Sequence, residues 1–178
     1  MPSGGFINDV VVTHDAAYFT NTTGGQLFAV PLVAGGALPP SGRFSPTAIG
    51  AANPNGIETA PDNKALLVVS GGALFRFDPA TGITTQTSLG GADVVNGDGL
   101  VRQGRTLYVV QNRSNRIAVV KLNADGTAGT VQERLGEGLP LDVPSTADLF
   151  GNAIYAVNAR FGAPMTPDTP YEIVRVER

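Results

Sequence analysis

Asn96-Gly97-Asp98-Gly99-Leu100 is the stretch that decides how this sequence is interpreted, because a similar pattern opens three other segments. Each polar opening leads into an apolar run that ends in polar residues, such as residues 107–111. The openings are centred, at steps of 47, 43 and 47 residues, on Asn8, Asn55, Asp98 and Ser145. A fixed period of this size is typical of radial or stacked repeat proteins.

The composition favours strands and turns and disfavours several classes of protein. The 178 residues include 23 Gly and 13 Pro with 15% charged residues, which indicates many turns and few exposed helices. A net charge of −3 disfavours nucleic acid as a partner. The absence of Cys excludes a disulfide framework and a thiolate metal site. Neither a membrane-spanning run nor the features of a signal peptide are expected, so the compartment is left open.

Within each repeat, β-branched and aromatic residues alternate with Gly, Pro and Asn turns, which predicts antiparallel strands. In the second repeat the strands are expected over residues 56–60, 65–69, 73–77 and 83–89. In the third repeat the last two are expected over residues 116–122 and 129–135. The first repeat has its third strand over residues 26–32, then a Gly/Pro-rich link to Arg43 and a poorly marked fourth strand. The fourth repeat ends after strands at 154–157 and 171–176.

Four antiparallel strands repeated at this period predict an all-β fold, a β-propeller of four four-stranded blades. We expect one domain over residues 1–178, with blades at about 6–47, 53–91, 96–136 and 143–178. A sandwich of short strands is the alternative, but it does not explain why the opening recurs in phase. The last blade lacks a recognisable fourth strand, so we expect an incomplete propeller with a six-bladed parent. Open strand edges then favour self-association with another chain.

Strand direction predicts which polar residues meet. Because neighbouring strands are antiparallel, the start of the first strand and the end of the second lie at the same face of each blade. The openings should then converge around the propeller axis, which brings together Asn8, Asp9, Asn55, Asp98 and Ser145. The ends of the second strands should form an outer ring of Asn21, Ser70, Gln111, Asn112, Arg113, Asn158 and Arg160.

The converging side chains predict a site for a hard cation. Asn and Asp oxygens suit Ca²⁺ or Mg²⁺, while Zn²⁺ is less favoured because the single His14 is expected in a turn at the opposite face. Asp98 is a candidate ligand and general base, and Arg113 and Arg160 are candidates for holding a substrate. An Asn or Asp before Gly is by itself an ordinary turn residue. The shared phase of Asn8, Asn55 and Asp98 favours a polar funnel instead. No Ser nucleophile elbow and no P-loop occur in the sequence.

The openings of the first three repeats, together with residues 61–64 and 74–82, resemble the regucalcin and gluconolactonase-like six-bladed β-propellers, with a tail similar to a bacterial subgroup. The resemblance covers repeats one to three well and repeat four loosely, so the chain would correspond to the C-terminal four blades.

The resemblance implies a divalent cation, often calcium, held in the channel mouth by a Glu of the first blade, two Asn and an Asp. By motif, Asn55 and Asp98 match the second Asn and the Asp, and Asn8 matches the Asn that approaches the metal or the substrate. The implied activity is hydrolysis of lactones or related esters, in which the metal polarises the carbonyl and Asp98 helps to activate water. A non-enzymatic propeller that binds a ligand or a protein is the alternative.

Overall fold

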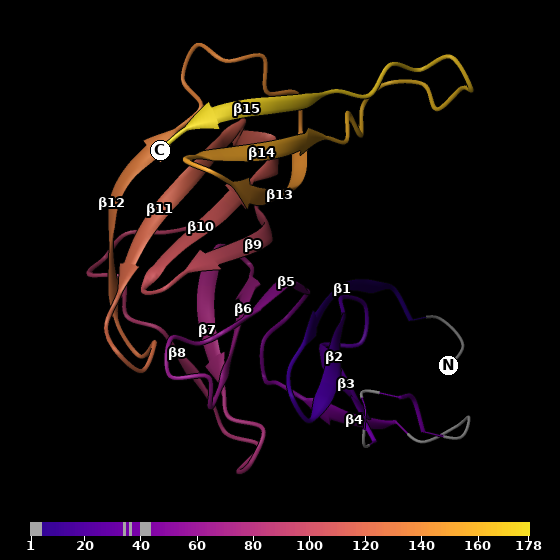
Figure 1. Ribbon diagram of the computed structural model, residues 1–178, viewed down its shortest axis with the longest axis vertical. Helices are drawn as coiled ribbons and strands as arrows, with labels where there is room; N and C mark the ends of the chain where they lie inside the picture. Colours follow the sequence, from indigo (N-terminus) through magenta and orange to yellow (C-terminus); the bar gives the residue numbers. More distant parts are fainter. Residues whose placement is uncertain (1–4, 34, 36, 40–43) are drawn as a thin grey trace.

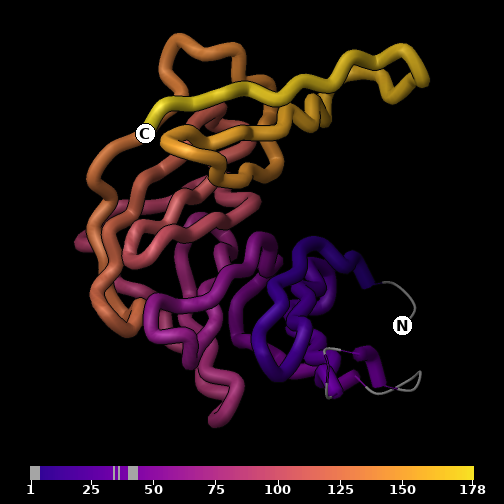
Figure 2. Tube along the Cα trace, viewed as in Figure 1, coloured from indigo at the N-terminus to yellow at the C-terminus, as the bar shows by residue number. Residues whose placement is uncertain are grey.

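Four antiparallel sheets follow one another in an arc (Figure 1), so the predicted all-β propeller fold is confirmed. The computed structural model describes residues 5–33, 35, 37–39 and 44–178. Two features of the sequence analysis lie partly outside this range. One is the expected link up to Arg43, and the other is the N-terminus, whose first four residues bear on the signal-peptide expectation. The path of the chain (Figure 2) runs from the first sheet at one end of the arc to the last sheet at the other. Within the described residues, no helix combines the length and apolarity needed to cross a bilayer.

Each sheet is built from consecutive strands, and the first strands of successive repeats contact one another on the inner side of the arc. The first sheet contains β1 (Ile7–Val12), β2 (Ala16–Asn21), β3 (Gln26–Pro31) and β4 (Ser45–Ala48). The second contains β5 (Pro54–Thr59), β6 (Leu66–Ser70), β7 (Ala73–Phe77) and β8 (Thr84–Gln86). The third contains β9 (Gly97–Gln103), β10 (Thr106–Gln111), β11 (Arg116–Leu122) and β12 (Gly129–Leu135), with the short 3₁₀ turn η2 (Asn112–Ser114) after β10. The fourth contains β13 (Pro144–Phe150), β14 (Ala153–Asn158) and β15 (Ile173–Glu177).

The strand predictions agree best where the turn signals are strongest. The bounds of β11 and β12 are those that the sequence predicts. The poorly marked fourth strand of the first repeat is β4, and β8 is shorter than the expected residues 83–89. The last sheet has three strands in the order β13-β14-β15, which agrees with the missing signal for a fourth strand.

Three apolar layers hold successive sheets together. Leu27 of the first sheet packs with Ile57 and Val68 of the second. The next layer joins the second sheet to the third, and the last joins the third to the fourth, with almost fully buried aliphatic side chains on both sides. Burial of apolar surface contributes about 25 cal/mol per Å². These layers therefore fix the angle between blades and, with it, the position of the innermost strands.

Every innermost strand carries one extra residue at the same place. The register between each first and second strand shifts by one residue where the polar openings lie. Such β-bulges disrupt the local pairing and redirect side chains, and they are common beside functional sites. In each bulge, two consecutive residues of the first strand lie opposite one residue of the second strand. These pairs are Asn8-Asp9, Asn55-Gly56, Asp98-Gly99 and Ser145-Thr146.

Candidate functional site

The four openings meet at one cavity of about 210 Å³. It is lined by Asn8, Asp9, Asn55, Asp98, Gly99, Ser145 and Thr146. The predicted convergence of the openings is therefore confirmed. Two of these side chains are carboxylic acids and none is a base, so the cavity favours a positively charged occupant.

Glycine in the second bulge position lets neighbouring innermost strands approach one another. A Cβ on Gly56 would lie 2.0 Å from the carbonyl oxygen of Asp98. A Cβ on Gly99 would lie 2.6 Å from Oγ1 and 2.8 Å from Cα of Thr146. The Asn-Gly and Asp-Gly pairs thus combine two roles, because the polar residue faces the cavity and the glycine makes room for the next blade.

Asp98 is the most enclosed acid of the cavity. It is buried, and Nδ2 of Asn112 donates to its Oδ2 at 2.9 Å. Burial raises the pKa of Asp98, the nearby Asp9 carboxylate raises it further, and the amides of Asn112 and Asn55 partly offset the shift. A carboxylate with a raised pKa is a stronger proton acceptor than an ordinary exposed one.

Asp9 supplies a second carboxylate, which the sequence places near the axis without assigning it a role. Its Oδ1 accepts the backbone N–H of Val10 at 2.8 Å, and its Oδ2 accepts that of Ile57 at 3.0 Å. Burial raises the pKa of Asp9, while the two backbone donors act in the opposite direction. Asp9 therefore joins the first blade to the second and adds negative charge to the cavity.

The two asparagines of the cavity differ in how their polar atoms are satisfied. Oδ1 of Asn55 is buried, and no described group donates a hydrogen bond to it. Asn8 is exposed, and its Nδ2 donates to Oγ1 of Thr22 at 3.0 Å. A buried oxygen without a donor is costly, so Asn55 presents an acceptor that a cation would satisfy.

Replacing Asp98 by Asn should raise stability at neutral pH in the absence of divalent cations. Because the folded-state pKa of Asp98 is raised above 3.8, the folded protein binds more protons than the unfolded chain between these two pKa values. Stability of the wild type therefore falls as pH rises through that window. Urea denaturation with EDTA should show Asp98→Asn more stable at pH 7 and nearly equal to the wild type near pH 3. An equal difference at both pH values would contradict this.

The end residues of the second strands have a structural role. Nε2 of Gln111 donates to the carbonyl of Val95 at 2.6 Å, and its Oε1 accepts Nε of Arg116 at 3.0 Å. Asn158 bonds the backbone of Asp142 and of Pro140, both at 2.9 Å. Asn21 and Ser70 likewise bond backbone atoms close to the start of their own innermost strand. These four residues of the predicted outer ring are buried and hold the segment that leads into each innermost strand.

The two candidate substrate-binding arginines do not line the cavity. Arg113 is exposed in η2. Nε of Arg160 pairs with Asp142 at 2.9 Å, and its Nη1 donates to the carbonyl of Pro170 at 3.0 Å, which holds the loop before β15. His14 is exposed beside Asp15, in the turn between β1 and β2.

Among the described residues, no group of three or more His, Cys, Asp or Glu side chains comes together. A cation in the axial cavity would therefore depend on amide, hydroxyl or backbone oxygens besides Asp9 and Asp98. The donor set fits a hard ion such as Ca²⁺, which takes carboxylate, amide and water oxygens together. The unpaired Oδ1 of Asn55 supports the same conclusion.

The fold and cavity define a β-propeller with an acidic axial site. No family model matches the sequence, and no curated protein matches it significantly. Solved structures share the fold at low identity. The major allergen Mala s 1 of Malassezia sympodialis gives a TM-score of 0.67 at 14% identity, over 99% of this chain and 58% of that one.

Two further solved structures carry names of enzymes. A protein provisionally described as a 6-phosphogluconolactonase of Bacteroides uniformis gives a TM-score of 0.62 at 16% identity, over 94% and 56% of the two chains. Glutaminyl cyclase of Myxococcus xanthus gives 0.60 at 15%, over 99% and 75%. This chain thus spans little more than half of two of these three structures. Likeness at this identity shows the fold alone.

Proposed function

We propose that this propeller is a divalent-cation-dependent hydrolase of lactones or related esters, with its site in the axial cavity. The observation that carries the proposal is the buried Oδ1 of Asn55, which has no described donor and lies among the residues lining the acidic cavity. Carboxylate and amide oxygens around a small polar cavity form the environment that calcium prefers. The fold shared with a protein provisionally described as a 6-phosphogluconolactonase is compatible with this function and does not by itself establish it.

Asn55, Asp98 and Asn8 are the residues that would hold the cation, with Asp9 adding negative charge beside them. When bound, a divalent cation polarises a substrate carbonyl and lowers the pKa of a water ligand. Asn8 can offer its side-chain oxygen, because its Nδ2 is already engaged by Thr22. The set suits Ca²⁺ better than Mg²⁺, whose octahedral geometry is stricter, and Zn²⁺ is disfavoured by the absence of His and Cys ligands.

Asp98 would accept the proton of the attacking water. Its raised pKa brings the carboxylate closer to the pH at which it works as a general base. Asn112 fixes the orientation of the carboxylate through Oδ2, and Oδ1 of Asn112 is itself held by the backbone N–H of Arg113 at 2.5 Å. Because Oδ1 of Asn112 accepts this bond, Nδ2 of Asn112 is the atom that faces Asp98 and donates to it. Asp98 therefore enters the reaction with its side chain already positioned.

The substrate would bind across the mouth of the cavity. A volume of about 210 Å³ is below the roughly 300–1,000 Å³ of ordinary ligand pockets, so the cavity suits an ion and the reacting group of a substrate. Arg113 is exposed close to Asn112 and can attract a carboxylate or phosphate on the substrate. Arg160 can contribute only if substrate competes with its bonds to Asp142 and Pro170.

We further propose that the chain is related to the regucalcin and gluconolactonase-like propellers and corresponds to four blades of a six-bladed parent. Three consecutive bulges that place Asn8, Asn55 and Asp98 around one axis support this relationship. The same proposal includes hydrolysis of lactones or related esters by the parent. It also includes a Glu, from a blade of the parent that precedes these four, as a further ligand of the cation.

Turnover of a panel of small lactones and aryl esters, measured with Ca²⁺, with Mg²⁺ and with EDTA, tests the proposed function. We expect hydrolysis of at least one lactone that requires the added cation and stops with chelator. Turnover that is indifferent to EDTA would contradict cation dependence. Absence of turnover with either cation would favour the non-enzymatic binding propeller.

A further inference from the structure

Successive sheets of this protein pack in one fixed manner. We call the side of a sheet that faces the preceding sheet its front face, and the side that faces the following sheet its back face. Front faces contribute Ile57 and Leu100 to the apolar layers, whereas back faces contribute Leu27, Leu74 and Ile117. Ile57 and Leu100 each follow the bulge of their strand directly, and Leu27, Leu74 and Ile117 occupy one equivalent position in the third strands. The same two faces therefore meet in the contacts between successive described sheets.

The first sheet has a front face that the described residues leave uncovered. Val10 pairs with Phe19 across β1 and β2, just as Ile57 pairs with Val68 in the second sheet. Ile57 and Val68 are almost fully buried, yet Val10 is 46% exposed. An apolar cavity of about 270 Å³ opens on this front face, lined by Ile7, Phe19, Phe28, Val30 and Phe44.

The last sheet has the matching uncovered back face. Ile173 pairs with Val157 at the position that Leu27, Leu74 and Ile117 occupy in the other three sheets. Those three equivalents are at most 1% exposed, whereas Ile173 is 68% exposed. Phe150 is also exposed there and packs edge to face on Tyr155, with ring centroids 6.4 Å apart. The charged side chains Arg175 and Glu177 pair with each other.

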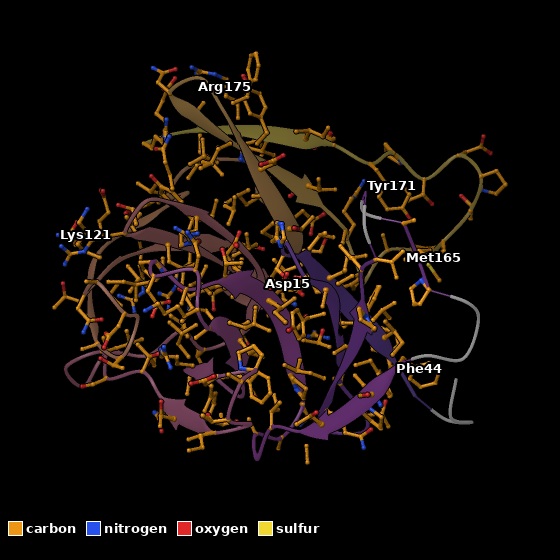
Figure 3. All side chains as sticks on the ribbon, turned by 60° about the horizontal axis from the view of Figure 1, so that its bottom comes forward. Asp15, Phe44, Lys121, Met165, Tyr171 and Arg175 are labelled. Atoms are coloured by element: carbon orange, nitrogen blue, oxygen red, sulfur yellow. The ribbon has the colours of Figure 1, made fainter. Side chains whose placement is uncertain are left out.

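We propose that a second copy of this chain covers these faces, with the back face of its last sheet seated on the front face of the first sheet. The chain itself shows that such a front face packs on such a back face, and it carries one of each uncovered by the described residues. In Figure 3, Phe44, which lines the cavity on the front face of the first sheet, lies at the lower right, and Arg175 of the last sheet lies at the upper left.

A contact of this kind is heterologous, because the two copies contribute different surfaces. Two copies related by a two-fold axis would use this contact twice. In a six-bladed parent two further blades would cover these faces, and the present proposal assigns that place to a second copy of this chain. This contact uses sheet faces and leaves the edge of β15 outside it.

Light scattering after size exclusion, on the full chain at about 50 μM, tests this proposal. Val10→Arg damages only the front face and Ile173→Arg only the back face, and both positions are exposed enough for the monomer to fold. We expect a dimeric wild type and a monomeric form of each variant. Thermal melting of each variant should remain cooperative, which would show that loss of the dimer is not loss of the fold.

Mixing the two variants gives the decisive result. Val10→Arg keeps its back face and Ile173→Arg keeps its front face, so an equal mixture should regain a dimer through one intact contact, at lower affinity than the wild type. A monomeric wild type would overturn the proposal and leave the faces to a further blade. Variants that still dimerise alone, or a mixture that stays monomeric, would overturn it in favour of an edge contact or a symmetric one.

Discussion

Replacing Gly56 by Ala should destabilise the protein by about 3 kcal/mol or more. The added Cβ would lie 2.0 Å from the carbonyl oxygen and 3.0 Å from the carbonyl carbon of Asp98, and 3.1 Å from Cγ of Leu100. The obstacle is backbone of the next blade, so relief requires β5 and β9 to separate. That movement would loosen the apolar layer between the second and third sheets as well as displace Asp98.

Gly162 is the matched control for this substitution. A Cβ there meets no atom within 4 Å, and its backbone does not adopt a positive φ. Urea denaturation should therefore show a change within about 0.5 kcal/mol for Gly162→Ala. Equal stabilities of Gly56→Ala and Gly162→Ala would show that the innermost strands are not as close as the structure places them.

Replacing Asp98 by Ala should lower cation-dependent lactone turnover by at least about 100-fold, the smaller end of the effects of general acid–base groups. The substitution removes a ligand and the proton acceptor together, and it leaves the amide of Asn112 without its acceptor. The fold should survive, because the apolar layers do not depend on the carboxylate. Steady-state rates and thermal melting of the same preparation separate the two effects.

Asp125→Asn is the matched control for the role of Asp98. Asp125 lies in the turn between β11 and β12, is exposed, and bonds Thr127 within that turn. Asn can keep these bonds, so turnover should stay within about two-fold of the wild type, well below the effect expected of a proton-transfer group. Full activity of Asp98→Ala would remove this residue from the mechanism.

The repeat period predicted most of the fold because turns leave local signals. Asn and Gly mark the ends of β11 and β12, so the bounds of these strands can be predicted without information from other blades. β4 was hard to predict because residues 45–48 carry little strand propensity, and the strand forms by pairing with β3. The absence of a fourth strand signal in the last repeat agrees with its three-stranded sheet.

The polar convergence at the axis was also predictable, but the role of each residue was not. Alternation along a strand cannot reveal a bulge, so the sequence does not say how Asp9 meets the backbone of Ile57. The polar ends of the second strands suggested a ring available to ligands. In the structure Gln111 and Asn158 are buried and bond backbone carbonyl groups, which a sequence pattern cannot distinguish from exposure.

Calcium titration by isothermal calorimetry, on the wild type and on Asp98→Ala, tests most directly whether the axial cavity is a cation site. We predict one Ca²⁺ per chain with micromolar affinity for the wild type and no detectable binding for the variant. Wild-type protein that binds no calcium, or a variant that binds it as tightly, would contradict the central claim.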